Sequence, residues 1–247
     1  MNGRDTAAPV ALVIGGSQGI GAGVTAALAA AGCRVAIAYH RNREAAQEVV
    51  AEAGALAVRA DVADPAQVDA LFGETRDHFN APVQILVNSA GLLADALVGE
   101  MSIAQWHDAL TINLTAPFLC ASRAAADMAA SGWGRIVSIG SAAGVRGSAG
   151  QANYAAAKAG LIGLTRSLAR ELAPTTTCNL VMPGPVDTAM ITHLTDKRRR
   201  QLVDMIPFKR FGTVAEVACA VAFLCSQEAS FITGAVLPVD GGMSMGY

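Results

Sequence analysis

The feature that most constrains the fold is a regular alternation of short, almost continuous apolar runs with longer segments rich in alanine and leucine. Seven runs have strand length: 10–15, 34–39, 55–60, 83–88, 135–140, 177–182 and 235–240. The longer segments have helical spacing: 19–31, 43–53, 65–79, 102–131, 151–173 and 213–226. Strands that are apolar on both faces are typical of parallel sheets covered by helices on both sides. The alternation therefore predicts an α/β, doubly wound parallel sheet of about seven strands.

No charge run, repeat or flexible linker divides the chain, so residues 1–247 are predicted to form a single domain. Segment 187–212 breaks the rhythm, because it is longer and more polar than the other strand-to-helix connections. Long connections at the carboxyl ends of parallel strands are commonly lids, so this segment is predicted to cover a substrate. Its run of four cations, 197–200, is interpreted as a solvated helix face, with contact to an acidic partner as the alternative.

The composition argues against several classes of protein. A net charge of −2 and a pI near 6.1 give no footprint for nucleic acid or an anionic membrane. No apolar run has the length of a membrane helix, and the N-terminus does not resemble a secretory signal. Five cysteines without a C-x-x-C pair and four histidines without i, i+4 pairing disfavour disulfide and metal sites. These features predict a cytoplasmic protein without a bound metal.

A glycine-rich turn directly follows the first predicted strand. Gly15, Gly19 and Gly21 are spaced G-x-x-x-G-x-G between that strand and a helix. Such a turn lets the backbone approach a pyrophosphate and places phosphate charge at the helix N-terminus. Glycine-rich turns also serve as plain tight connections, but the context of a first βαβ unit favours a dinucleotide site.

The end of the second predicted strand bears on the choice of dinucleotide. A carboxylate there would accept hydrogen bonds from the ribose of NAD and repel a 2′-phosphate. The sequence has no acid at 39–42, and Arg41 could pair with a phosphate. The alternative is an ordinary surface arginine at a strand end. The absence of an acid favours NADP(H).

Two weaker signals follow the third and fourth predicted strands. Asp61, followed by Val62, could accept a hydrogen bond from an adenine amino group, or it could begin the turn before Pro65 and cap the next helix. The segment 88–91, with the sequence NSAG, places small residues where a nicotinamide ribose would lie. Both signals support a dinucleotide site without establishing one.

A tyrosine and a lysine, each among only three of their kind, stand four residues apart. Tyr154 and Lys158 therefore share one face of a predicted helix. Ser141, thirteen residues before the tyrosine, closes the fifth predicted strand. Asn113 lies inside the fourth predicted helix, where its side chain competes with helical hydrogen bonds.

These four side chains are suited to the reduction of a ketone, which needs a hydride and a proton. A nicotinamide supplies the hydride. A phenol has a pKa of about 10, and a nearby ammonium, aided by an oxidised nicotinamide, is expected to lower that pKa. Ser141 could hydrogen-bond the carbonyl oxygen as it gains charge, and Asn113 could hold a water. The alternative is a surface Tyr/Lys pair, but its coincidence with Ser141, Asn113 and the glycine turn favours catalysis.

Taken together, the motifs resemble the short-chain dehydrogenase/reductase family from about residue 9 to the C-terminus. The resemblance is carried by Asn113, Ser141 and the stretches GGSQGIG, DV (61–62), NSAG, YAAAK, PGPVDT (183–188) and PVDGGMSMGY. Within the family, the chain is most similar to the 3-oxoacyl-(acyl-carrier-protein) reductases. That similarity lies in GQANYAAAKAGLIGLTRSLAREL and in the last forty or so residues.

The resemblance implies a Rossmann-type domain that reduces a 3-ketoacyl thioester with NADPH. Tyr154 would be the acid, Lys158 its pKa modulator and ribose ligand, Ser141 the oxyanion partner and Asn113 the water anchor. The implied cofactor contacts are Gly15, Ser17, Gln18, Gly19, Ile20, Gly21, His40, Arg41, Asp61, Val62, Asn88, Ala90, Gly91, Tyr154, Lys158, Pro183, Gly184, Val186 and Thr188. Relatives are usually homotetramers that pack the fourth and fifth helices in one interface and the last strand in another.

The chain departs from the pattern in two respects that bear on its ligands. Gln18 replaces an arginine that many NADPH-using relatives carry, which leaves Arg41, with His40, as the implied 2′-phosphate ligand. Stretches 129–133 and 172–177 contain no cation, although carrier-protein reductases often carry basic residues there. The carrier could dock on the lid instead, or the substrate could be a polyketide intermediate, a coenzyme A thioester or a free ketone. A non-catalytic dinucleotide-binding scaffold or sensor is a further alternative.

Overall fold

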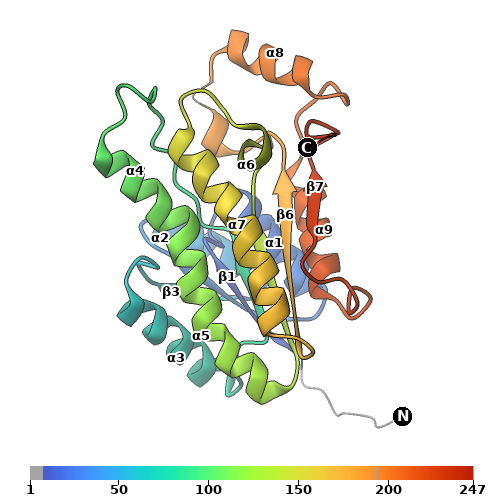
Figure 1. Cartoon of the computed structure of the whole chain (residues 1–247). Helices are drawn as coiled ribbons and strands as arrows, with labels where there is room; N and C mark the ends of the chain where they lie inside the picture. Colours follow the sequence, from blue (N-terminus) through green and yellow to red (C-terminus); the bar gives the residue numbers. More distant parts are fainter. Residues whose placement is uncertain (1–7, 193, 247) are drawn as a thin grey trace.

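The computed structural model describes residues 8–192 and 194–246. Residues 1–7 and 247 of the predicted domain, and His193 of the predicted lid, lie outside the described residues. One sheet of seven parallel strands, in the order β3-β2-β1-β4-β5-β6-β7, runs through the molecule (Figure 1). The strands are β1 (Val10–Ile14), β2 (Arg34–Tyr39), β3 (Leu56–Arg59), β4 (Ile85–Asn88), β5 (Gly134–Ile139), β6 (Thr176–Pro183) and β7 (Val236–Val239). The predicted fold class is confirmed.

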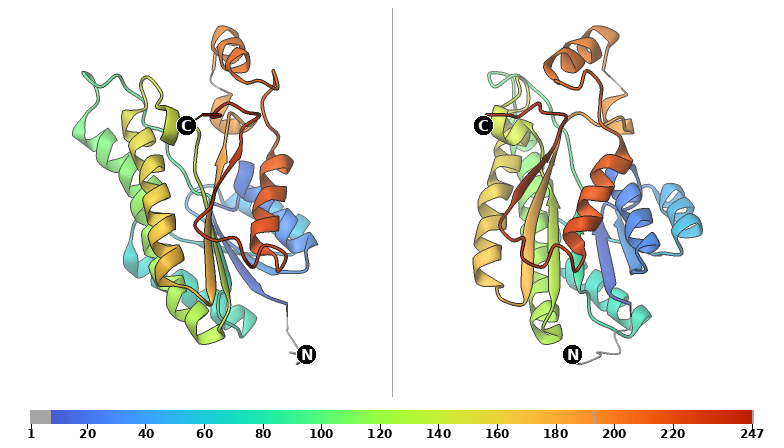
Figure 2. Two further views of the ribbon diagram at one scale, coloured as in Figure 1. Left: turned by 45° about the vertical axis from the view of Figure 1, so that its right-hand side comes forward. Right: turned by 90° about the vertical axis from the view of Figure 1, so that its right-hand side faces the viewer.

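Helices cover both faces of the sheet. They are α1 (Gly19–Ala30), α2 (Arg43–Ala53), α3 (Pro65–Phe79), α4 (Ile103–Leu110), α5 (Ala116–Ser131), α6 (Ala143–Arg146), α7 (Ala152–Glu171), α8 (Asp196–Met205) and α9 (Val214–Cys225). Figure 2 shows α1, α2 and α9 on one side of the sheet and α4, α5 and α7 on the other. None of the helices in the described part of the chain is both long and apolar enough to span a membrane.

Strand β1 shows why the apolar runs of the sequence are continuous. Successive side chains of a strand point to opposite faces of the sheet. Val10, Leu12 and Ile14 pack in the core beneath α3 and α5, whereas Ala11 and Val13 pack in the core beneath α1 and α9. All five are buried, so neither face of this central strand has room for a polar residue.

The prediction of one continuous helix over 102–131 is wrong, because the helix is interrupted in its middle. Helix α4 ends at Leu110, a π-helical turn spans Thr111–Thr115, and α5 starts at Ala116. Two residues account for the break. Pro117 has no N–H to donate to the carbonyl of Asn113 four residues earlier, and the Asn113 side chain itself donates to Ala109 O at 2.8 Å. The widened turn is therefore a consequence of the candidate catalytic asparagine.

The predicted lid segment, 187–212, is a loop whose two ends meet. Val186 and Gly212 form an isolated parallel bridge, and Asp187 N–H donates to Gly212 O at 3.1 Å. Between these ends lie a short 3₁₀ turn (Ala189–Ile191) and α8. All views place α8 beyond the carboxyl ends of the strands (Figures 1 and 2). The lid segment is thus anchored at its base and projects over the edge where ligands bind in such sheets.

Candidate active site

A cleft of about 1450 Å³ lies at the carboxyl edge of the sheet. Its walls come from the segments that follow β1 to β6, together with the lid segment. The chain runs from β1 outward to β3 and then crosses over to β4, so the strand order reverses between β1 and β4. Ligands of open parallel sheets bind at such a reversal. The cleft is lined by every predicted catalytic and cofactor residue except Asn88 and Asn113.

The glycine turn is packed so closely that side chains are excluded from it. Gly15 has a φ of +74°, and a methyl group there would lie 2.8 Å from the backbone of Ala90. A methyl group on Gly21 would lie 2.1 Å from the carbonyl oxygen of Gly15. Helix α1 begins at Gly19 and has no acidic residue in its first turn. The turn therefore offers a narrow backbone cradle and an unopposed helix N-terminus, which fit the pyrophosphate of a dinucleotide.

At the far end of the cleft, the residues that directly follow β2 are exposed basic side chains rather than an acid. His40 and Arg41 are exposed, and Asn42 caps α2 by accepting a hydrogen bond from Ala45 N–H at 3.0 Å. His40 Nε2 lies 4.0 Å from Asp61 Oδ2. This contact links the loop after β2 to the loop after the neighbouring strand β3. This arrangement leaves the Arg41 guanidinium directly before a helix cap, on the wall of the cleft.

The structure separates the two roles considered for Asp61. The cap of α3 is Asp64, whose carboxylate accepts from Ala66 N–H at 2.9 Å, so the prediction that Asp61 caps this helix is wrong. Asp61 does begin the preceding turn, since its carbonyl accepts from Asp64 N–H at 3.1 Å. Its carboxylate accepts from Ala63 N–H and lines the cleft. The carboxylate is thus positioned by its own turn and remains available to a ligand.

The structure does not bring Asn88 into the cleft. Asn88 is the last residue of β4 and is only 4% exposed. Its side-chain amide donates to Ser138 Oγ on β5 at 3.3 Å. Its three successors, Ser89, Ala90 and Gly91, line the cleft instead. Because side chains alternate along a strand, the last residue of β4 packs inside the sheet while the loop after it reaches the ligand.

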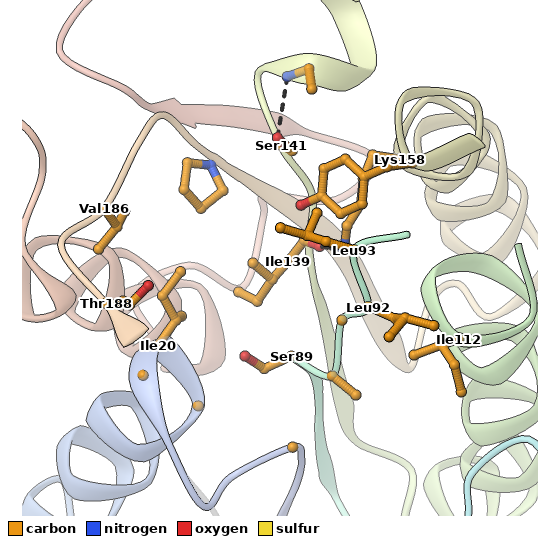
Figure 3. A pocket seen from close by; sticks show the side chains of 18 of the residues that line it. Ile20, Ser89, Leu92, Leu93, Ile112, Ile139, Ser141, Lys158, Val186 and Thr188 are labelled. Atoms are coloured by element: carbon orange, nitrogen blue, oxygen red, sulfur yellow. Dashed lines mark hydrogen bonds between the residues drawn. The ribbon is translucent and has the colours of Figure 1, made fainter. Parts of the chain in front are cut away.

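On the opposite side of the cleft from Ser141 and Lys158 lie the residues after β6. Figure 3 shows Val186 and Thr188 beside Ile20 of α1, facing Ser141 and Lys158 across the cleft. A methyl group on Gly184 would lie 3.0 Å from Asp240, so the backbone after β6 runs close to the turn after β7. The implied cofactor contacts that follow β6 therefore share one wall with the glycine turn.

Ser141, Tyr154 and Lys158 form the facing wall. Ser141 lies two residues after the end of β5. Its Oγ accepts a hydrogen bond from the N–H of Ala143, the first residue of α6, at 3.2 Å. Tyr154 and Lys158 lie one turn apart on α7, with Lys158 Nζ 5.6 Å from the centre of the tyrosine ring. Lys158 Nζ also donates to the carbonyl oxygen of Ile139 at 2.8 Å. The sheet and α7 thus fix the three side chains together.

The pKa of Tyr154 moves in the opposite direction from the prediction. Burial raises the pKa of the phenol, and Asp95 adds to this increase, while a hydrogen bond with Ser141 lowers it. Burial lowers the pKa of Lys158 to about 8, so its ammonium still carries most of its charge at neutral pH. The prediction that the Lys158 amine makes the Tyr154 phenol unusually acidic is therefore wrong when only the side chains of the protein are considered. Desolvation outweighs the hydrogen bond with Ser141.

Asn113 is completely buried behind the cleft. Its amide nitrogen donates to Leu92 O at 2.9 Å and Ala109 O at 2.8 Å, and its Oδ1 accepts from Leu92 N–H at 3.3 Å. Both amide protons are used, so the side chain fastens the loop after β4 to the π-helical turn. Any water held at Asn113 must be held through an oxygen.

The sequence did not predict most of the residues that line the cleft beyond Ser141 and Tyr154. Leu92, Leu93 and Ile112 give it an apolar lining (Figure 3). Gln151 donates to Asp95 at 2.9 Å on the same side. From the lid segment come Arg198, Leu202 and Met205. The helical spacing of these last three was a usable signal, whereas the loop residues carry no local pattern.

Metal chemistry finds no support in the side chains. Within residues 8–192 and 194–246, no group of three or more histidine, cysteine or acidic residues could hold a metal ion. The five cysteines of the chain are free thiols, and burial raises the pKa of Cys120 and Cys178 to about 12. These two thiols are inert core residues.

Comparisons with known proteins agree with this architecture. A family model described as enoyl-(acyl carrier protein) reductase matches residues 15–244. The 3-oxoacyl-(acyl-carrier-protein) reductase MabA of Mycobacterium bovis is 44% identical over 96% of this chain and 93% of its own length. FabG of Escherichia coli, which bears the same enzyme name, is 42% identical over 96% of this chain and 97% of its own. The reductase of that name from Synechocystis is 42% identical over 96% and 98%.

The match spans the glycine turn, the wall that carries Ser141, Tyr154 and Lys158, and the lid segment. It covers nearly the full length of each relative. The chain therefore belongs to the short-chain dehydrogenase/reductase family, whose members are oxidoreductases that bind a nicotinamide dinucleotide.

Proposed function

We propose that the protein reduces a 3-ketoacyl thioester to the 3-hydroxyacyl thioester with NADPH. The observation that carries this proposal is the placement of Ser141, Tyr154 and Lys158 on one wall of a cleft whose other wall is the glycine turn. The printed names of the relatives, at 42–44% identity, support the 3-ketoacyl substrate. The apolar lining by Leu92, Leu93 and Ile112 suits an acyl chain.

The chain's own residues position the substrate and supply the proton. The bound cofactor would supply the hydride and, once oxidised, a positive charge. Tyr154 would donate its hydroxyl proton to the ketone oxygen, and Ser141 would donate a hydrogen bond to the same oxygen. The raised pKa of Tyr154 keeps the phenol protonated, which is the form that a reduction consumes.

Lys158 and Asn113 would complete the proton path. An ammonium has three N–H groups, and one of them donates to Ile139 O, which leaves two for the cofactor ribose and a water. We assign the water to the main-chain carbonyl of Asn113, because Pro117 cannot donate to it. The side-chain amide protons of Asn113 are already engaged.

The preference for NADP(H) over NAD(H) rests on the end of β2. Arg41 and His40 line the cleft there, and no carboxylate follows the strand. A guanidinium can pair with a 2′-phosphate by two charge-assisted hydrogen bonds. The exposed Gln18 in the glycine turn carries no charge, so Arg41 would provide most of the discrimination.

We further propose a cytoplasmic homotetramer. Ile103 on α4 and Phe118 on α5 are 70% and 50% exposed, and Phe231 before β7 is fully exposed. Large apolar side chains gathered on a surface are typical of protein interfaces. They support one interface through α4 and α5 and a second beside the last strand. The free thiols support a reducing compartment.

A substrate panel tests the proposed function. NADPH consumption is followed with acetoacetyl thioesters of an acyl carrier protein and of coenzyme A, with a small free ketone, and with a crotonyl thioester. The last is included because the matching family model is described as an enoyl reductase. Turnover of the ketoacyl thioesters alone supports the proposal. Preference for the free ketone would favour a secondary-alcohol dehydrogenase, and cofactor binding without any turnover would favour a scaffold or sensor.

A further inference from the structure

One face of α8 is turned toward the substrate end of the cleft. Arg198, Leu202 and Met205 all line it, and their spacing of i, i+4 and i+7 places them on the same side of the helix. The helix lies beyond the carboxyl ends of the strands in every view (Figures 1 and 2). A long substrate that extends from Tyr154 toward α8 would therefore meet this face.

The four cations of the run 197–200 are not equivalent. Arg199 donates to Asp187 at 3.1 Å, and its guanidinium stacks 4.9 Å from the ring centre of Phe211. Lys197 and Arg200 are exposed and do not line the cleft. Arg199 thus secures α8 to the base of the lid segment, while Arg198 is the one cation of these four that lines the cleft.

The charged side chains that line the cleft favour binding of an anion at Arg198 over binding of an anion deeper in the cleft. The other cations that line it are Arg41 at the cofactor end, Lys158 behind the tyrosine and Arg146 on α6. Asp95 and Asp108 also line the substrate side and would repel an anion there. Arg198 combines a cation with the apolar side chains of Leu202 and Met205, which matches a ligand that is apolar near its reacting end and anionic farther out.

We propose that Arg198 binds the phosphate of a phosphopantetheine arm that carries the substrate thioester. This inference rests on the proposed function and specifies its substrate class. The arm separates the thioester from its phosphate by a long, mostly uncharged chain, so the ketone can face Ser141 and Tyr154 while the phosphate remains at the mouth. Arginine suits a phosphate because its planar donors pair with two oxygens at once.

Two thioesters that differ only in the phosphate test the proposal. Acetoacetyl-pantetheine and acetoacetyl-4′-phosphopantetheine are reduced with NADPH by the full-length chain. The wild-type protein is expected to have the lower KM for the phosphorylated compound. Arg198→Ala is expected to raise that KM about tenfold, with unchanged kcat, because an exposed charge-assisted contact is lost. The KM for acetoacetyl-pantetheine and that for NADPH should remain unchanged.

Arg200→Ala is the matched control, since it removes a cation of the same helix that does not line the cleft. It should change neither KM, and Arg198→Lys should retain part of the preference. Higher salt should reduce the preference in the wild-type protein and have little effect in Arg198→Ala. Acetoacetyl-coenzyme A and the acetoacetyl carrier protein then distinguish the two sources of the arm.

The outcomes separate this inference from the proposed function. Reduction of both thioesters with equal KM by the wild-type protein would retain the function and overturn the phosphate site. A rise in the KM for NADPH in Arg198→Ala would instead assign this arginine to the cofactor and also overturn the inference. If none of the pantetheine, coenzyme A and carrier-protein thioesters is reduced, the proposed function fails and the inference fails with it.

Discussion

The Nζ atom of Lys158 lies 2.8 Å from the main-chain carbonyl oxygen of Ile139, the last residue of β5. This hydrogen bond joins the central sheet to α7 two residues before Ser141. It holds a nearly buried ammonium beneath Tyr154, where burial has already lowered the pKa of the lysine to about 8. The candidate catalytic wall is thus stabilised by a main-chain contact that leaves two ammonium protons available.

Tyr154→Phe is expected to lower kcat for reduction by about 10³-fold, because the proton donor is removed while the ring remains. NADPH should still bind, since the substitution leaves the glycine turn intact. Binding is measured by titration calorimetry and kcat by NADPH consumption. Retention of most of the activity would exclude Tyr154 as the acid.

Lys158→Met is expected to differ most from the wild-type protein in how its stability depends on pH. The pKa of Lys158 is about 8 in the folded protein and 10.5 for a free lysine. At a pH where the lysine of the unfolded chain is charged, burying it on folding lowers the free energy of unfolding. This destabilisation is greatest below about pH 8 and disappears as the pH rises toward 10.5. The free energy of unfolding of the wild-type protein should therefore rise by about 2 kcal/mol relative to Lys158→Met between pH 7 and pH 10.

Urea unfolding at several pH values measures this difference, and Tyr154 is present in both proteins, so its titration largely cancels. Parallel pH dependences for the two proteins would show that Lys158 is not desolvated in the folded state.

The strands were predictable because β1 packs in two cores at once, which requires apolar residues at consecutive positions. The π-helical turn was also within reach, since Asn113 and Pro117 stand four residues apart in the sequence. The raised pKa of Tyr154 was not, because it depends on how deeply the assembled walls bury the phenol. Likewise, the sequence could not show that the Asn88 side chain points away from the cleft, because that direction depends on its contact with Ser138 on β5.

Arg41→Ala is expected to weaken NADPH binding by about tenfold to a hundredfold and NADH binding by less than about twofold. The guanidinium lines the cleft next to β2, and only NADPH carries a 2′-phosphate for it to bind. Arg43→Ala removes a cation two residues away that does not line the cleft, so it is the matched control. Equal losses for both cofactors in Arg41→Ala would remove this residue from the 2′-phosphate site.

Asn153 is a buried clamp beside the tyrosine, and Asn153→Ala is expected to lower the free energy of unfolding by about 2–4 kcal/mol. Its amide donates to Ala94 O at 3.0 Å and Gln105 O at 2.9 Å, and its Oδ1 accepts from Tyr154 N–H at 2.8 Å. Truncation would remove all three hydrogen bonds of this completely buried side chain and leave a cavity in their place. Gln151→Ala, which breaks only an exposed bond to Asp95, should cost less than about 1 kcal/mol in the same urea titration.

Gly21→Ala is expected to lower affinity for NADPH by more than about tenfold, because the added methyl group would lie 2.1 Å from Gly15 O and force the turn open. Gly73→Ala in α3 is the matched control, since nothing lies within 4 Å of a methyl group at that site. It should leave cofactor affinity unchanged and stabilise the helix by about 0.5–1 kcal/mol. If Gly21→Ala binds NADPH as tightly as the wild-type protein, the narrow turn is not the pyrophosphate cradle, and the cofactor must be held by other segments of the cleft.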